Sequence, residues 1–442
     1  MKASRFNILI STQNNHYLLF NSASAALAEI EADNFPAVAR LLSASAPSPG
    51  DSDREFHQVL CDGKFLIPDE TDELAELVIT NRRQRFAGET LFLTIAPTLS
   101  CNFRCEYCFE SRQSSFMTRE TEDAVLQFAA RKAARARNLL VTWFGGEPTL
   151  CVDTIARLQI GLREIAQEHS LSLLPTALVT NGYLLDRNLA IKLQSLGITD
   201  IQVTLDGPRR IHDVRRRLAN GQGSFDIIMS NLRETADLLQ ITIRVNVDST
   251  SAATVPELIA ELDKQELLSR TNLYFAPVNE HSETCPDIRG RCFSTREFAA
   301  MQTNFYRELV STGLASVEYP MLAPGGHCGA ASENAFVISP RGDLYKCWEE
   351  ISLDQSHSIG SVFSETLSPQ QAGRLNRFLS WDPFQLSECR GCHVLPLCMG
   401  GCPRQGLDLR QTTHGACCSW KYNLEEMLRL HHHSGTRKEV TT

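Results

Sequence analysis

Residues 101–110 read CNFRCEYCFE, which spaces three cysteines as C-x3-C-x2-C directly after the strand-like run LFLTIAP (91–97). Neither a straight helix nor a straight strand aims Cys101, Cys105 and Cys108 at one point, so the chain must loop around whatever they bind. Thiolates prefer zinc or iron–sulfur clusters. A structural zinc ion takes four closed ligands, whereas three nearby cysteines fit a [4Fe–4S] cluster with one open iron. Zinc completed by a distant residue is the alternative.

The composition is that of a globular protein of two or three domains, with 442 residues, 43% hydrophobic and 21% charged. A net charge of -9 argues against general nucleic-acid binding. No apolar run reaches the roughly 18 residues of a membrane span, and the start lacks the apolar stretch of a signal peptide. We therefore expect a cytoplasmic protein with no membrane partner. Fifteen cysteines, most of them in clustered spacings, favour metal or cluster ligation over disulfides.

Between residues 90 and 280, short β-rich runs alternate with helical patterns. The runs are LFLTIAP, LLVTWF, PTALVT, DIQVTL, ITIRVNV and LYFAPV, and the helical patterns lie near 118–136, 152–169, 186–196, 224–239 and 254–268. This alternation predicts an α/β fold with a parallel sheet and crossover helices, either an open doubly wound sheet or a partial barrel.

Small or polar residues follow four successive strands of this region. The second strand ends in WFGGEP and the later ones in VTNGYL, VTLDGP and VNVDST. Because the carboxyl ends of parallel strands meet at one face, we expect one site there. Two glycines let the backbone approach a ligand closely, and a glutamate can accept from an ammonium group. The candidates are Gly145, Gly146, Glu147, Asn181, Thr204, Asp206 and Asn246.

Residues 1–85 predict a small separate domain. FNILIS and HYLLFN flank a polar TQNN turn and predict a hairpin. SASAALAEIEA, FPAVARLLSA and REFHQVLCDG predict three short helices, with a loop at 45–53 and a strand in KFLIPDE. The composition is winged-helix-like, but the stretch is not basic enough for DNA binding.

The chain beyond residue 280 is rich in cysteine. A bridging region, 281–320, contains a helix that starts at the capping-box pair Ser294 and Glu297. Residues 321–425 then carry more thiols than one tetrahedral zinc ion binds, so two metal centres are needed, either zinc ribbons or clusters. Their spacing is C-x13-G-x4-C, then C-x2-C-x5-C-x3-C, then an adjacent pair: Cys328, Cys347, Cys389, Cys392, Cys398, Cys402, Cys417 and Cys418. We expect residues 426–442 to be a polar, frayed tail.

The cysteine triplet with Tyr107 before its last member, followed by GGEP, resembles the radical S-adenosylmethionine (SAM) superfamily. That resemblance implies a partial (β/α)6 TIM barrel and a [4Fe–4S] cluster whose open iron chelates SAM. One electron then cleaves SAM to a 5′-deoxyadenosyl radical, which abstracts hydrogen from the substrate. Gly145, Gly146 and Glu147 would contact the methionine amino group. Asn181, Thr204 and Asn246 would contact ribose or carboxylate. A further motif match, D-G-P-x-x-x-H-D-x-x-R, would let an arginine pair with the SAM carboxylate: Asp206, His212, Asp213 and Arg216.

The later cysteines resemble the SPASM extension of these enzymes, which houses two auxiliary [4Fe–4S] clusters. The resemblance implies that Cys328, Cys347 and Cys402 hold the first cluster. Its fourth ligand would be Cys292, Cys285 or His327, or the iron would stay open. The second cluster would take Cys389, Cys392 and Cys398 with one late cysteine, for which Cys417 is favoured over Cys418 because Trp420 and Lys421 then match the family.

Relatives with this extension act mostly on peptides and proteins. Trp348 stands where sulfatase-maturing relatives carry an aspartate base, and residues 1–85 resemble leader-peptide recognition domains. The resemblance thus implies an oxidoreductase of peptide modification (RiPP maturation) that installs a thioether or C–C cross-link in a ribosomally made precursor bound through its leader. An electron donor such as flavodoxin or ferredoxin would serve it. The alternatives are a peptide epimerase, an anaerobic sulfatase-maturase-like enzyme and, in another class, a non-catalytic zinc-binding protein.

Overall fold

The computed structural model describes residues 1–12, 16–43, 53–110, 114–279, 286–313, 317–321, 328–352, 354–408 and 416–439. Two compact units divide the chain. The first comprises Met1–Ala87, Ser316–Cys328 and Trp381–Thr442, and the second comprises Gly88–Ala315 and Gly329–Ser380. Within the described ranges, no helix is both long and apolar enough to cross a membrane. Most of the loop expected at 45–53 lies outside them.

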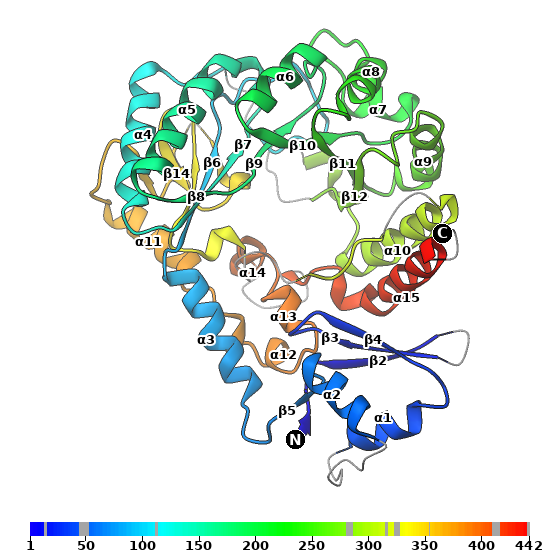
Figure 1. The fold of residues 1–442 in the computed structure, drawn as a ribbon. Helices are drawn as coiled ribbons and strands as arrows, with labels where there is room; N and C mark the ends of the chain where they lie inside the picture. Colours follow the sequence, from blue (N-terminus) through cyan, green and yellow to red (C-terminus); the bar gives the residue numbers. More distant parts are fainter. Residues whose placement is uncertain are drawn as a thin grey trace. The chain divides into compact units, whose positions relative to one another are not determined.

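The second unit is built on a parallel sheet with the strand order β12-β11-β10-β9-β7-β6. Helices connect successive strands and lie along the outer side of the sheet (Figure 1). The α/β fold with a parallel, barrel-like core is thereby confirmed. The strands are β6 (Thr90–Ile95), β7 (Asn138–Trp143), β9 (Thr176–Thr180), β10 (Ile198–Thr204), β11 (Gln240–Val247) and β12 (Asn272–Pro277), with the short β8 (Ser172–Leu173) beside β7. The helices are α4 (Arg119–Ala133), α5 (Val152–Glu168), α6 (Arg187–Ser195), α7 (Arg209–Arg215), α8 (Phe225–Thr235) and α9 (Val255–Lys264).

Alternation along the strands explains why this sheet forms. In β6 the side chains of Leu91, Leu93 and Ile95 are fully buried, whereas their neighbours along the strand are partly exposed. β7 repeats the pattern, ending at the buried Trp143. One face of each strand therefore packs under the helices, and the other is left for the interior of the partial barrel. Side-chain caps start several of the helices, such as Thr118 on α4 and Asp186 on α6.

Three further strands widen the sheet beyond β6. β13 (Ala335–Ile338) pairs parallel to β6, and β14 (Asp343–Tyr345) and β15 (Gly360–Ser361) follow antiparallel. The unit also holds α10 (Thr295–Thr312), which begins with the predicted capping box of Ser294 and Glu297, and α11 (Pro369–Leu379). Short 3₁₀ turns complete it: η2 (Pro148–Cys151), η3 (Ala252–Thr254), η4 (Pro286–Arg291), η5 (Gly329–Ala331) and η6 (Trp348–Glu350).

The first unit contains a three-stranded antiparallel sheet in the order β2-β3-β4. Its elements from the N-terminal region are β1 (Lys2–Ala3), β2 (Asn7–Ser11), β3 (Tyr17–Asn21), β4 (Ala26–Ile30), α1 (Phe35–Leu41), α2 (Arg54–Asp62), β5 (Leu66–Ile67) and α3 (Glu73–Phe86). The later cysteine-rich region adds η7 (Pro383–Gln385), α12 (Ser387–Arg390), α13 (Leu395–Cys398), α14 (Pro403–Asp408) and α15 (Trp420–Glu439). The residues expected to be a tail from 426 thus continue α15 as far as Glu439.

The helix expected in SASAALAEIEA is wrong, because residues 26–30 form β4 and pair with β3 from Tyr17↔Ile30 to Asn21↔Ala26. The side chain of Asn21 accepts from the backbone N–H groups of Ala23 and Ser24, both at 3.0 Å. Ala25 then adopts a left-handed φ of 58°. This turn reverses the chain at the point where a helix would have begun, so cross-strand pairing overrides the helix propensity of alanine.

Candidate functional site

A cavity of about 230 Å³ in the second unit collects most of the predicted site residues. All three cysteines of the CNFRCEYC loop line it, together with Gly145 and Gly146. Asn181, Thr204, Arg216 and Asn246 line it as well. These polar residues come from the ends of β9, β10 and β11 and from the residue after α7. The loop after β6 and the ends of four other elements thus face one space.

The two glycines at this site are positions where a side chain would strike backbone. Gly145 has a φ of +118°, and a Cβ there would lie 2.3 Å from the carbonyl oxygen of Thr98. A Cβ on Gly146 would lie 2.4 Å from the oxygen of Ser100 and 2.6 Å from that of Leu99. The Gly-Gly pair therefore packs directly against the segment that leads into Cys101, and only glycine permits that approach.

Glu147 does not reach the cavity. Its side chain is fully buried, and its Oε1 accepts from the N–H and hydroxyl of Thr149 at 3.0 and 2.6 Å and from the hydroxyl of Thr180 at 2.7 Å. Its Oε2 accepts from the N–H of Asn181 at 2.7 Å. Burial raises the pKa of Glu147, and these donors oppose that rise. The carboxyl group therefore ties the ends of β7 and β9 together, and its contact with the amino group of SAM stays a prediction.

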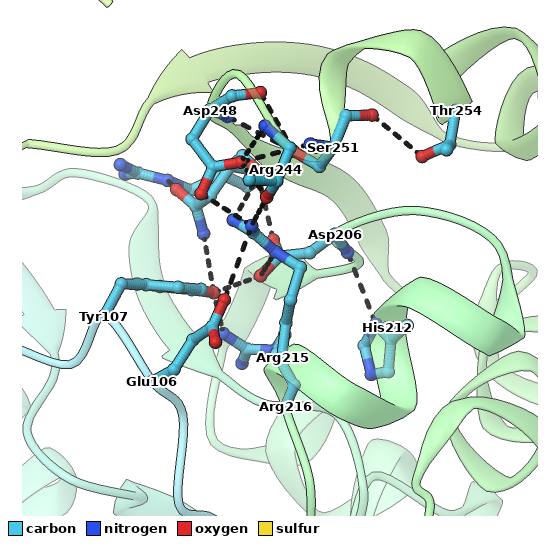
Figure 2. A network of polar contacts seen from close by, with 12 residues as sticks. Glu106, Tyr107, Asp206, His212, Arg215, Arg216, Arg244, Asp248, Ser251 and Thr254 are labelled. Atoms are coloured by element: carbon cyan, nitrogen blue, oxygen red, sulfur yellow. Dashed lines mark hydrogen bonds and ion pairs between the residues drawn. The ribbon is translucent and has the colours of Figure 1, made fainter. Parts of the chain in front are cut away.

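A network of polar contacts joins residues of the cavity wall to buried neighbours (Figure 2). The hydroxyl of Tyr107 donates to Asp206 and accepts from Arg216 at 2.6 Å and from the amide of Asn246 at 3.2 Å. Arg216 is only 8% exposed, and its Nε has no hydrogen-bond partner in the described part of the chain. The network fixes the guanidinium of Arg216 at the cavity wall with a donor to spare, which suits the binding of a carboxylate.

The basic stretch 208–217 divides into two parts with different roles. Arg209 and Arg210 make exposed ion pairs with Asp226 and Glu257. His212 is fully buried; its Nδ1 accepts from the N–H of Asp206 at 3.3 Å, and burial and the two nearby arginines hold its pKa well below the usual value. Asp213 accepts from the N–H groups of Ser224 and Phe225 and so caps α8. The sequence motif therefore combines a structural histidine and cap with a cavity arginine.

Arg215 offsets the negative charge of the carboxylates in this network. It is 3% exposed, donates to Asp248 at 2.7 Å and lies 3.8 Å from Asp206 and 3.7 Å from Glu106. Replacement by methionine keeps the volume but leaves buried carboxylates unpaired, so we expect the free energy of unfolding to fall by about 3–5 kcal/mol. Denaturant unfolding followed by fluorescence measures it.

The matched control is R187Q, because Arg187 pairs with Asp237 on the surface, where both side chains are about half exposed. Loss of that pair should cost no more than about 1 kcal/mol. Equal losses for R215M and R187Q would contradict the structural role of Arg215.

The three thiols of the loop are partly buried on the cavity wall. Burial raises the pKa of Cys101 to about 12, and burial raises the pKa of Cys108 further. Ligation by a positively charged metal centre overcomes such protonation, because bound thiols are deprotonated outright. In the described part of the chain, no three His, Cys, Asp or Glu side chains converge on one ion position. Three thiols on one cavity suit a cluster, whose ligands bind separate iron atoms.

Three aromatic side chains line the cavity as a wall that no sequence motif predicted. The ring of Phe144 stacks on Phe109 with centroids 6.4 Å apart and on Trp348 with centroids 5.5 Å apart. Trp348 is 44% exposed, so the wall reaches the surface. Because Phe109 follows Cys108 directly and Trp348 follows Cys347, the stack joins two segments that both carry predicted ligands.

Three polar residues of the cavity were also missed. Gln202 and Arg244 precede Thr204 and Asn246 by two positions, so they lie on the same face of β10 and β11. The alternation of side chains along each strand, with a period of two, could have predicted them. Glu110 lines the cavity with a buried Oε2 that has no hydrogen-bond partner among the described residues, and burial and the charge of Glu147 raise its pKa to about 8.

A second, small cavity in the first unit collects the ligands expected for one auxiliary cluster. Cys389, Cys392, Cys398 and Cys417 line a space of about 20 Å³ together with Lys421. Cys418 does not line it; its side chain instead hydrogen-bonds Cys398, which lowers the pKa of that thiol to about 6. Four thiols and a cation around one space fit a cluster, and they favour Cys417 as the fourth ligand.

This geometry predicts opposite results for neighbouring substitutions. C417S should lose one cluster, about four iron atoms of the roughly twelve expected for three clusters, whereas C418S should keep them. Iron and sulfide analysis of anaerobically reconstituted protein measures both. Loss of iron in C418S but not in C417S would assign Cys418 as the ligand.

The first auxiliary cluster stays a prediction. Cys347 follows β14 in the second unit, whereas Cys328 and Cys402 belong to the first. Cys292, a candidate fourth ligand, packs with Val278 and Ile288 near Tyr107. The other candidates, Cys285 and His327, lie outside the described residues.

Comparison with known proteins identifies the family that the middle of the chain resembles. Residues 95–262 match the model of the Radical SAM superfamily. The chain is 23% identical over 344 residues to the cysteine-type anaerobic sulfatase-maturating enzyme of Clostridium novyi (strain NT), covering 72% of this chain and 88% of that protein. It is 30% identical over 196 residues to the GTP 3′,8-cyclase of Actinobacillus pleuropneumoniae serotype 3 (strain JL03), covering 42% of this chain and 52% of the relative.

Solved structures share the fold. Native anSMEcpe with bound AdoMet and Kp18Cys peptide aligns with a TM-score of 0.59 at 19% identity, over 80% of this chain and 99% of that one. Streptococcus suis SuiB bound to precursor peptide SuiA aligns with a TM-score of 0.53 at 14% identity, over 94% of this chain and 98% of that one.

Proposed function

Because residues 95–262 match the Radical SAM superfamily, we propose that this chain is a maturase that installs a thioether or carbon–carbon cross-link in a ribosomally made precursor peptide. The observation that carries the proposal is the convergence of Cys101, Cys105 and Cys108 with the glycine and polar strand ends in one cavity. This arrangement suits a [4Fe–4S] cluster and SAM side by side, and it favours an enzyme over a non-catalytic zinc-binding module.

The residues of the chain divide the work of this site. A bound cluster and SAM would supply the radical that removes hydrogen from an unactivated carbon. Gly145 and Gly146 leave the backbone open to the ligand, and Arg216, held by Tyr107, offers its unpaired Nε–H to a carboxylate. The wall of Phe109, Phe144 and Trp348 gives the cavity an apolar side, which limits the water beside a radical formed there.

Two lines of support point to a peptide substrate. The relative from Clostridium novyi is a sulfatase-maturating enzyme, and its match extends over 88% of that protein, whereas the match to the GTP cyclase covers about half of the cyclase. In the first unit, β2 and β4 pair only with β3 within the described residues, so each has an edge to which an extended leader could add as a strand.

Sulfatase-maturase-like modification is the second candidate. The position after Cys347 is Trp348, which cannot act as a base, but the next residue, Glu349, lines the cavity. A carboxylate at that place could take the proton released when a serine or cysteine side chain is oxidised to an aldehyde. The substrate decides between the two functions.

Mass spectrometry tests the proposal. The anaerobically reconstituted enzyme is incubated with SAM, a reductant and a candidate precursor peptide encoded beside its gene. Loss of two hydrogens, with fragmentation that locates a new bond between two residues, supports cross-linking. An unchanged mass with deuterium taken up from solvent means epimerisation, and conversion of a sulfatase-derived peptide instead means sulfatase maturation.

A further inference from the structure

Trp381 has a buried hydrogen-bond donor without a partner. Its side chain is 9% exposed, and its indole Nε1 has no hydrogen-bond partner among the residues that the structure describes. A buried indole N–H almost always finds an acceptor, since leaving it unsatisfied costs about 1–3 kcal/mol. The acceptor of Trp381 is therefore expected to be something that binds beside it.

The surroundings of Trp381 identify that acceptor by its chemistry. Trp381 lines the small cavity of the first unit, where the other lining side chains are the four cysteines, Lys421 and aliphatic groups. Those aliphatic side chains are Leu386, Val394, Leu395 and Ala416. Sulfur is thus the acceptor that the cavity side chains offer.

Two glycines hold the indole ring in place. A Cβ on Gly406 would lie 2.2 Å from Cη2 of Trp381, and one on Gly400, which has a φ of +83°, would lie 3.3 Å from Cζ2. Both glycines thus lie against the benzene edge of the ring, and Gly400 also lines the cavity. The ring is clamped by close backbone approach, so its N–H has a fixed direction.

We propose that Trp381 donates its indole N–H to a sulfur of the iron–sulfur cluster held by Cys389, Cys392, Cys398 and Cys417, and thereby raises the reduction potential of that cluster. The reduced cluster carries one more negative charge than the oxidised one, so a donor to sulfur stabilises the reduced form more. The ammonium group of Lys421, on the same cavity, acts in the same direction. Trp381 is a positioning and tuning residue, and the inference rests on the second auxiliary cluster of the proposed function.

The test compares W381F with wild type as full-length, anaerobically reconstituted protein. Phenylalanine keeps an aromatic ring but removes the donor. In a redox titration followed by electron paramagnetic resonance (EPR), we expect the signal of this auxiliary cluster to appear at a more negative potential in W381F. The iron content, and SAM cleavage at the cluster of Cys101, Cys105 and Cys108, should be unchanged. The matched control is W420F, because Trp420 packs with Ile10 and Leu424 in the core of the first unit and does not line the cavity.

Equal potentials in W381F and wild type would overturn the inference and leave the proposed function standing. If wild-type protein held no cluster at these cysteines, so that neither C417S nor C418S changed the iron content, both would fall. Should W381F lose the cluster altogether, wild-type protein grown with ¹⁵N-indole tryptophan still decides. Electron–nuclear double resonance of its auxiliary cluster should show coupling to ¹⁵N that W420F retains, and no such coupling would refute the hydrogen bond.

Discussion

Replacing Gly146 with alanine is expected to reduce SAM cleavage by about 10²-fold or more, although the position is not itself a predicted ligand of the cluster. The new Cβ would lie 2.4 Å from the oxygen of Ser100 and 2.6 Å from that of Leu99, and both atoms belong to the backbone. The N–H of Glu147 also donates to the oxygen of Ser100 at 2.9 Å, so the segment cannot retreat without breaking that bond. The strain must therefore move the loop that carries Cys101.

Chromatography of 5′-deoxyadenosine formed from SAM measures this effect, with iron content determined on the same samples. The control is G373A, because Gly373 lies within α11 and an added Cβ meets no atom within 4 Å. Alanine there should be neutral, or stabilising by up to about 1 kcal/mol. A G146A enzyme as active as G373A would show that the close approach seen at Gly146 is not needed for the site.

Cys105→Ala is expected to abolish SAM cleavage and to remove about four of roughly twelve iron atoms, because three thiolates are the fewest that hold a cluster with one open iron. The folded structure should survive, since Cys105 lies on the cavity rather than in a hydrophobic core cluster. EPR of the reduced protein adds a second measurement: the spectral change caused by SAM should vanish, while the auxiliary signals persist.

Cys61→Ala is the control for this substitution, because Cys61 packs against the core of the first unit and lies on neither cysteine cavity. It should keep its full iron content and activity. A C105A protein that retained all its iron and still cleaved SAM would remove Cys105 from the site.

The sequence predicted the barrel strands well because each carries its own local signal. β6 and β7 alternate buried and half-exposed residues, and their ends are marked by the cysteine loop and by Gly145. Parallel topology then brings those ends together, so the cavity residues from Cys101 to Asn246 could be named from the chain alone. The helix expected at β4 was wrong, and the partners of Glu147 were not foreseen, for a common reason. The pairing of Ala26–Ile30 and the contacts of Glu147 are tertiary, and local composition does not encode them.

Residues that act through shape rather than motif were not predictable. Phe109, Phe144 and Trp348 are far apart in the chain, and their stack exists only because β7 and η6 bring the rings together. Trp381 likewise stands eight positions before Cys389, with no motif to connect them. Its buried N–H became informative only once the cavity beside it was known.

The central claim is that the cavity of Cys101, Cys105 and Cys108 performs reductive SAM chemistry. The measurement that tests it most directly is quantification of 5′-deoxyadenosine and methionine after anaerobic incubation of iron-reconstituted wild-type protein with SAM and dithionite. We expect wild-type protein to form both products in equal amounts and only with the reductant, and C105A to form neither. Iron-loaded wild-type protein that leaves SAM intact under these conditions would contradict it.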